Sequence, residues 1–192
     1  LRDFKLTVIP CANYTHKSRY ILPVKPSPNL PDMSAIYWYP STCFFEGTQL
    51  SEGRGTAHPF LYFGHPTLPN TLFAFTPVSR EGAKDPKLRD QLCYGWNLAG
   101  TTPPPTAGNQ YQIQLNYLIK AYELFPGKDS FFIGKAGAPP TGYFFNKLAG
   151  NATLMQQIRN KLPEADIRKS WEPAHRQFKA IRKKYLCYPD FE

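Results

Sequence analysis

Residues 41–60 read STCFFEGTQLSEGRGTAHPF and bring together acids, an arginine and several glycines. Glu46 and Glu52 lie six positions apart, each is followed by glycine, and Arg54 comes two positions after the second acid. Glycine-rich backbone favours a tight loop whose amides can approach a ligand closely. Two carboxylates at one site can hydrolyse a glycosidic bond, and an arginine presents a planar fork to a carboxylate or a phosphate. The stretch therefore indicates a site for a sugar or an anion.

The same residues could instead stabilise the loop itself. On a helix, this spacing would place Glu46 and Glu52 on different faces, so only a folded loop lets them converge. In a purely structural role, Glu52 would pair with Arg54 or accept hydrogen bonds from backbone amides. Spacing alone is compatible with both interpretations.

The sequence contains no motif for a metal or a cofactor. His58 and His65 lie seven positions apart with no third ligand nearby. There is no G-x-S-x-G elbow, no Walker loop and no dinucleotide fingerprint, so we expect neither a cofactor nor a metal. No two cysteines have the spacing of zinc ligands. Their apolar neighbours instead indicate buried free thiols at Cys11, Cys43, Cys93 and Cys187.

The net charge of +9 favours anionic partners, such as nucleic acid, anionic lipid or an acidic polysaccharide. Residues 143–192 carry ten Lys/Arg against five acids, a pattern that is also typical of a solvated helix face. His16 lies in a basic stretch with tyrosines, NYTHKSRY, but no nucleic-acid motif accompanies it. No apolar run approaches the roughly 20 residues that span a bilayer. We therefore expect no nucleic-acid partner and no membrane span.

The order of predicted elements indicates an α+β fold: a mixed β-sheet from the first half, covered by helices from the second, with long Pro/Gly-rich loops. Residues 23–31 and 80–90 are predicted loops, the second one charged and at the surface. The predicted strands are 4–9, 58–64, 71–78 and 91–100. Residues 32–39 are predicted to form a short helix or turn that ends at Pro40. The other predicted helices are 109–125, 151–162 with Asn151 or Thr153 as the cap, and a last one after a Ser170 cap.

Two helices carry a stripe of apolar residues at three- or four-residue steps, which predicts one buried face on each. The first stripe is Leu115, Leu118, Tyr122 and Phe125. The stripe on the last helix is Phe178, Ile181 and Tyr185.

The run CFFEGTQLSEGRGT resembles the signature of the NamZ family, the exo-β-N-acetylmuramidases of peptidoglycan recycling, long known as a domain of unknown function. PSPNLPDMSAIYWYPST, FTPVS, QLCYGW and the terminal FKAIRKKYLCY also resemble family segments, so the resemblance covers nearly the whole chain. Two positions depart from the family pattern. Gln49 stands where asparagine is usual, and His58 where arginine is usual.

The resemblance implies a bacterial glycoside hydrolase that releases N-acetylmuramic acid from non-reducing ends of peptidoglycan fragments. It implies a periplasmic or secreted location, and a cleft between this domain and a Rossmann-like N-terminal domain. We expect residues 1–192 to be a single C-terminal domain that forms one wall of that cleft, with the N-terminal domain absent from this chain. The implied catalytic residues are Glu46 and Glu52, and the implied substrate-binding residues are Arg54, Gln49, Ser51 and His58.

A non-catalytic glycan-binding or substrate-positioning module is the alternative. Exposed Tyr37, Trp38 and Trp96 could stack on sugar rings, although aromatic side chains of this kind also pack in cores.

Overall fold

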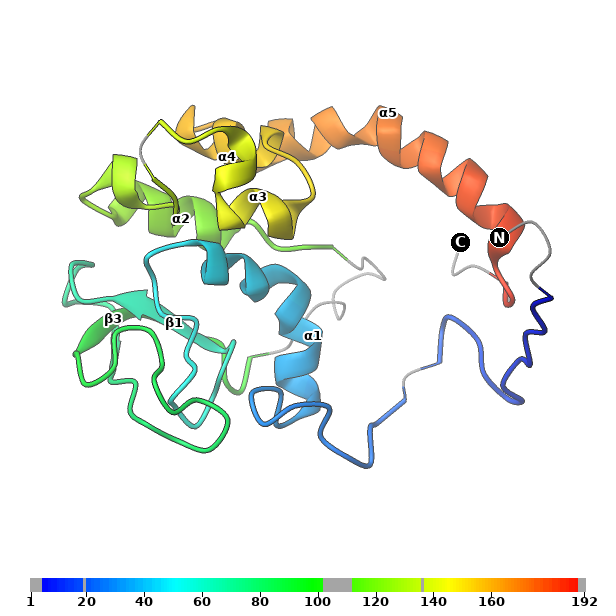
Figure 1. The fold of residues 1–192 in the computed structure, drawn as a ribbon, viewed down its shortest axis with the longest axis horizontal. Coiled ribbons are helices and arrows are strands. Elements are labelled where there is room, and N and C mark those ends of the chain that lie inside the picture. The colour runs from blue at the N-terminus through cyan, green and yellow to red at the C-terminus, as the bar shows by residue number, and fades with distance from the viewer. Residues whose placement is uncertain (1–4, 19, 102–111, 136, 190–192) are drawn as a thin grey trace. The chain divides into compact units, whose positions relative to one another are not determined.

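The computed structural model describes residues 5–18, 20–101, 112–135 and 137–189. The chain divides into two compact units: Leu22–Ile167 is one, and Leu1–Ile21 with Arg168–Glu192 is the other. The larger unit contains the sheet and the motif loop that carries the acids. Figure 1 follows the elements along the chain from blue to red.

The larger unit contains a three-stranded sheet in the order β1-β3-β2. β1 is Tyr62–His65, β2 is Phe73–Phe75 and β3 is Cys93–Asn97. β2 and β3 fall inside predicted strand segments, β1 extends one residue beyond its predicted segment 58–64, and the α+β class is confirmed. The sheet is antiparallel at both pairings, so the prediction of a mixed sheet was wrong. Each strand is short, and antiparallel neighbours need no long crossover connection.

A glycine pair lets β1 and β3 approach closely. Gly64 lies opposite Gly95 across the ladder. A Cβ at Gly95 would lie 1.9 Å from the carbonyl oxygen of Phe63, so no other residue fits there. The ring of Phe63 stacks on the ring of Phe45 and on the indole of Trp96, with centroid-to-centroid distances of 4.3 and 5.5 Å. This aromatic stack joins the sheet to the segment that carries Glu46.

Helix α1 spans Met33–Thr42 and leads directly into residues 43–60, the segment that carries Glu46 and Glu52. Asp32 caps it, because its Oδ1 accepts a hydrogen bond from Ala35 N at 2.9 Å. The predicted end at Pro40 was wrong, since the helix continues for two residues beyond it. Ser41 and Thr42 are buried, so packing offsets the hydrogen bond that proline removes. A 3₁₀ helix, η1 (Cys43–Gly47), follows at once.

Helix α2, Asn116–Leu124, carries Leu118 and Tyr122 of the predicted stripe, and Leu115 and Phe125 cap its two ends. All four stripe residues are buried. The helix is shorter than predicted: residues 109–111 lie outside the described residues, and 112–115 precede the helix. Helix α4, Thr153–Arg159, lies within the predicted 151–162 and is shorter at both ends. Asn151, a predicted cap, accepts hydrogen bonds at its Oδ1 from the amides of Thr153 and Leu154. The sequence did not predict helix α3, Phe144–Ala149, which packs against η1.

Helix α5 runs without a break through Glu164–Arg182 and includes Pro173, so the predicted start after Ser170 was wrong. Phe178, Ile181 and Tyr185 are 58%, 56% and 79% exposed, so the stripe predicted to be buried is not. An apolar stripe shows which face of a helix can be buried, but burial needs a partner element. Those side chains find none among the described residues.

The predicted strand at 4–9 is also absent in the described part, residues 5–9. Leu6, Val8 and Ile9 are exposed, because no sheet edge pairs with this segment. Residue 4 lies outside the described residues. All four cysteines are free, but only Cys93 is buried. The prediction of burial was wrong for Cys11 and Cys187, which are exposed.

Candidate functional site

The motif loop, defined here as residues 43–60, is fixed to the sheet by backbone hydrogen bonds. Ser51 N donates to Gly64 O at 2.8 Å, and Gly64 N donates back to Ser51 O at 3.1 Å. Phe60 N donates to Glu52 O at 2.7 Å and closes the second half of the loop. Gln49 N donates to Phe131 O at 2.9 Å. The backbone around both acids is therefore held on several sides.

Two glycines of the motif are required by this backbone path. Gly53 and Gly55 have φ of +82° and +81°, a region that residues with a Cβ rarely adopt. A Cβ on Gly53 would lie 2.4 Å from Tyr62 O, and one on Gly55 would lie 2.5 Å from Val78 O. These glycines let the loop pack closely on its own chain.

The loop brings the two acids together around Arg54. Arg54 Nη2 lies 2.9 Å from Glu46 Oε2, and Nη1 donates to Glu52 Oε1 at 2.8 Å. The guanidinium also lies over the ring of Phe60, 4.8 Å from its centroid. The predicted convergence of Glu46 and Glu52 on a folded loop is thus observed. The structural interpretation also holds, because Glu52 pairs with Arg54.

Opposing effects act on the pKa of Arg54. Burial lowers it, whereas the carboxylates of Glu52 and Glu46 raise it, and the net pKa lies above its ordinary value. The guanidinium therefore stays charged between two acids.

Lys87 is a fourth member of this cluster, which the sequence did not predict. Its Nζ lies 3.1 Å from Glu52 Oε2. The same Nζ donates to the carbonyl oxygens of Phe45, Thr48 and Leu50 at 3.2, 2.9 and 2.8 Å. Lys87 thus holds the turn between the two acids and pairs with one of them. Its segment, residues 80–90, was predicted as a charged surface loop, and no local signal distinguishes Lys87 from the exposed Lys84.

Burial separates the roles of the two acids. The Glu52 side chain is 4% exposed and is enclosed by Arg54 and Lys87. The side chains of Glu46 and Arg54 are 17% and 32% exposed, so they form the accessible edge of the cluster. Two carboxylates and two cations balance in charge. Glu46 can therefore meet a ligand, while Glu52 fixes the cations behind it.

Two neighbours of Glu46 are held in their neutral forms. Burial, and then the Glu46 carboxylate, raise the pKa of the Cys43 thiol to about 11. Burial, Glu46 and Cys43 likewise raise the pKa of Tyr39, whose ring lies 4.8 Å from that of Phe60. A thiol with so high a pKa is a poor nucleophile at neutral pH. Cys43 and Tyr39 form the neutral side of the cluster.

The other predicted substrate-binding residues differ in how accessible they are. Ser51 is buried, and its Oγ accepts a hydrogen bond from Gly53 N at 3.1 Å. Gln49 and His58 are half-buried, and the His58 ring lies 4.9 Å from that of Tyr62. Ser51 therefore supports the loop, whereas Gln49 and His58 retain some access to solvent.

The aromatic residues predicted to stack on sugar rings also differ in burial. Trp38 is 6% exposed and belongs to the core. Tyr37 and Trp96 are half-buried, and Trp96 stacks on Phe63. Only these two present any ring surface to solvent.

Among the residues that the structure describes, no three His, Cys, Asp or Glu side chains are grouped so that they could hold a metal ion. Within the same residues, no helix combines the length and the apolar character needed to cross a membrane.

Comparison with known proteins places this loop in a family. Residues 37–188 match the family described as "Exo-beta-N-acetylmuramidase NamZ, C-terminal". The chain is 32% identical over 201 residues to the peptidoglycan beta-N-acetylmuramidase NamZ of Bacillus subtilis (strain 168), covering 97% of this chain and 46% of that protein. The fold is similar to the crystal structure of a DUF1343 family protein from Bacteroides fragilis NCTC 9343, with a TM-score of 0.82 and 42% identity. That match covers 96% of this chain and 49% of the other.

The chain thus spans about half the length of both relatives. The match includes the whole motif loop, so the resemblance carried by CFFEGTQLSEGRGT is confirmed. This chain belongs to the family of NamZ C-terminal domains.

Proposed function

We propose that this chain is the C-terminal part of a longer glycoside hydrolase that releases N-acetylmuramic acid from the ends of peptidoglycan fragments. The family membership and the Bacillus subtilis relative support a glycoside hydrolase. The observation that carries the proposal is the cluster on the motif loop: Glu46 at an accessible edge, held by Arg54. Such a group suits contact with a polar sugar.

In this proposal, Glu46 is the acid that contacts the substrate. Paired with a guanidinium, its carboxylate is suited to accept hydrogen bonds from sugar hydroxyls. Glu52 is the positioning residue, because it is enclosed and holds both Arg54 and Lys87. The motif loop then forms one wall of the active-site cleft. The other wall then comes from the part of the longer protein that lies outside this chain.

The basic character of the chain suits an anionic substrate. N-acetylmuramic acid carries a lactyl carboxylate, and the chain has a net charge of +9. Cleavage by carboxylates requires no cofactor. A peptidoglycan substrate further implies that the protein works in the bacterial cell envelope or outside the cell.

Hydrolysis of an aryl β-N-acetylmuramide tests the proposal. The 192-residue chain and the longer protein that contains it are assayed side by side, with the aryl β-N-acetylglucosaminide as the control substrate. We expect the longer protein alone to release the aryl group, because the cleft needs two walls. Release by the 192-residue chain would place the acid here, and Glu46 would then carry the chemistry. A longer protein that cleaves neither substrate would contradict the proposed activity and favour a binding module.

A further inference from the structure

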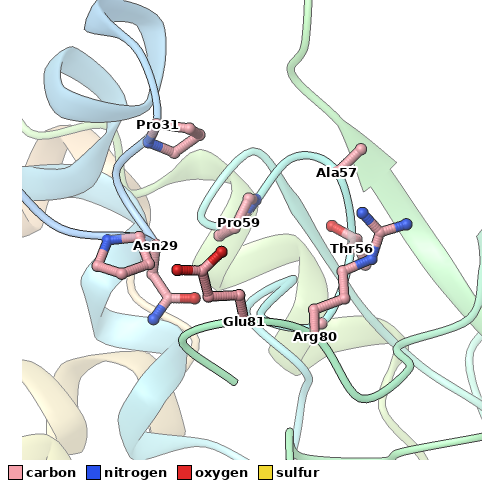
Figure 2. Close-up of a pocket in the computed structure, with 9 residues that line it drawn as sticks. Asn29, Pro31, Thr56, Ala57, Pro59, Arg80 and Glu81 are labelled. Carbon is pink, nitrogen blue, oxygen red and sulfur yellow. The ribbon is translucent and has the colours of Figure 1, made fainter. Parts of the chain in front are cut away.

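A cavity of about 320 Å³ lies beside the second half of the motif loop. This is within the usual size range of small-molecule sites. Three loops of the larger unit form it, and Figure 2 shows their side chains. The residues that matter here are Pro28, Asn29, Thr56, Pro59, Arg80 and Glu81. We call it the proline pocket.

Hydrogen bonds hold the rim of the proline pocket in place. Arg80 and Ala83 exchange backbone hydrogen bonds, both 3.1 Å long, and form a tight turn. Asn29 Nδ2 donates to the Gly82 carbonyl of that turn at 2.9 Å. Gly82 has a φ of +75°, and a Cβ there would lie 2.5 Å from Pro28 Cβ. The turn thus packs directly on the 27–30 segment, and the cavity exists before any ligand binds.

The pocket is also connected to the acid cluster, which is formed by Glu46, Glu52, Arg54 and Lys87. Thr56 Oγ1 donates to Gly53 O at 2.7 Å, inside the turn that separates Glu52 from the pocket. Val78 N donates to Gly55 O at 2.9 Å and fixes the segment that precedes Arg80 to the same turn. One rigid loop therefore presents Arg54 and the wall of the pocket.

Two opposite charges line the pocket without neutralising each other. Arg80 and Glu81 are both exposed, and within the described residues neither makes an ion pair. In Figure 2, Glu81 points toward Pro59 and Asn29, whereas Arg80 extends beside Thr56. Arg54, in contrast, already pairs with two carboxylates. Arg80 is thus better placed than Arg54 to take a carboxylate from a ligand.

We propose that the proline pocket binds the carboxylate-bearing group of the glycan, with Arg80 pairing with that carboxylate. Glu81 accepts a hydrogen bond from a neighbouring hydroxyl or amide, and the proline rings contact the apolar part of the group. This inference rests on the proposed function, which supplies a substrate with such a group. It makes Arg80 a specificity-determining residue outside the acid cluster.

The chemistry of N-acetylmuramic acid fits this arrangement. Its lactyl ether places a methyl group beside a carboxylate, and N-acetylglucosamine lacks both. An arginine fork binds a carboxylate through two parallel hydrogen bonds. When a peptide is attached, the lactyl carboxylate becomes an amide and the free carboxylate moves to the peptide. The pocket can therefore receive either carboxylate, and the two sources need separate probes.

Direct binding to the 192-residue chain tests the pocket without requiring turnover. N-acetylmuramic acid, N-acetylglucosamine and a muramyl dipeptide are titrated by NMR into the wild-type chain and into Arg80→Met. Lys84→Met is the matched control, because Lys84 is an exposed cation directly after the same turn and does not line the pocket. We expect Arg80→Met to weaken binding of the carboxylate-bearing sugar roughly tenfold or more. Lys84→Met should bind as the wild type does.

The result also identifies the source of the carboxylate. Arg80-dependent binding of N-acetylmuramic acid assigns the lactyl group, and Arg80-dependent binding of the dipeptide alone assigns the peptide. Binding of both carboxylate-bearing probes no tighter than that of N-acetylglucosamine would overturn the proposal. So would an Arg80→Met variant that binds both carboxylate-bearing probes like the wild type, or a chain that binds none of the probes. In each of those cases the longer protein could still hydrolyse the aryl muramide. The titration therefore tests the pocket, and the hydrolysis assay tests the proposed function independently.

Discussion

Arg54 bridges Glu46 and Glu52 with contacts of 2.9 and 2.8 Å, one acid at the accessible edge and the other enclosed. Removing the arginine leaves Glu52 buried, with Lys87 as its remaining ion-pair partner among the described residues. We predict that Arg54→Met lowers the free energy of unfolding by about 2 kcal/mol, less than for a fully buried pair because Arg54 is partly exposed. Urea denaturation measures this.

Arg89 offers the control for that prediction. Its ion pairs with Asp85 and Asp90 are exposed to solvent, so Arg89→Met should change the free energy of unfolding by under about 0.5 kcal/mol. Equal effects of Arg54→Met and Arg89→Met would show that the bridge does not stabilise the loop.

Lys87 should be as important to stability as Arg54. Its Nζ donates to three carbonyl oxygens and forms an ion pair with the Glu52 carboxylate. Lys87→Met should reduce the free energy of unfolding by about 2–4 kcal/mol, because it removes all four contacts. Lys87→Arg should not restore it, since a planar guanidinium cannot replace an ammonium that contacts four oxygens. Thermal melting of both variants beside Lys84→Met checks this, and three equal melting temperatures would contradict it.

The left-handed glycines provide a matched pair. Gly53 and Gly100 both have positive φ, at +82° and +78°. A Cβ on Gly53 would meet the backbone of Tyr62 at 2.4 Å, whereas one on Gly100 has nothing within 4 Å. Gly100→Ala should therefore lower the free energy of unfolding by only roughly 1 kcal/mol, the cost of placing alanine at a positive φ. Urea denaturation of both variants should show a clearly larger decrease in the free energy of unfolding for Gly53→Ala. An equal or smaller decrease would mean that the loop moves to accommodate the added methyl group.

The Cys43 thiol reports on the charge of Glu46. Burial and then Glu46 raise the pKa of Cys43 to about 11, so its thiolate forms only in alkaline solution. Glu46→Gln removes a negative charge, which lowers the pKa of Cys43 and increases the thiolate fraction at pH 9. We therefore expect iodoacetamide to alkylate Cys43 faster in Glu46→Gln, as followed by mass spectrometry.

Cys93 is the internal control in that experiment. Its pKa of about 12 arises from burial alone, so its alkylation rate should be the same in both proteins. An unchanged rate at Cys43 would show that Glu46 does not act on it.

Much of the fold follows from sequence because its signals are local. The strands β1, β2 and β3 are short aromatic runs, and the buried stripe of α2 recurs at helical spacing. The last helix shows the limit of such signals. Its stripe of Phe178, Ile181 and Tyr185 has helical spacing, yet these side chains are exposed. Helical spacing shows which face of a helix can be buried, but not whether another element packs on that face.

The candidate site was predictable in part for the same reason. Glycines beside Glu46 and Glu52 predicted a folded loop where the acids converge, and the loop has that form. Lys87 and Arg80 lie in one charged segment with no periodicity. The Lys87 side chain points inward to three carbonyl oxygens, whereas Arg80 lines a cavity. The path of the folded backbone determines this difference, and the local sequence does not show it.

The central claim is that Glu46 faces the substrate while Glu52 supports it, and the kinetics of Glu46→Gln in the longer protein test it most directly. Glu123→Gln is the control, because the Glu123 side chain is exposed and, among the described residues, pairs with the exposed Lys120. With an aryl β-N-acetylmuramide, we predict that kcat/KM of Glu46→Gln falls roughly 10- to 100-fold, as for loss of a charged hydrogen bond. The Glu123→Gln variant should be unaffected. A Glu46→Gln enzyme with the wild-type kcat/KM would contradict the account and leave the motif loop a purely structural element.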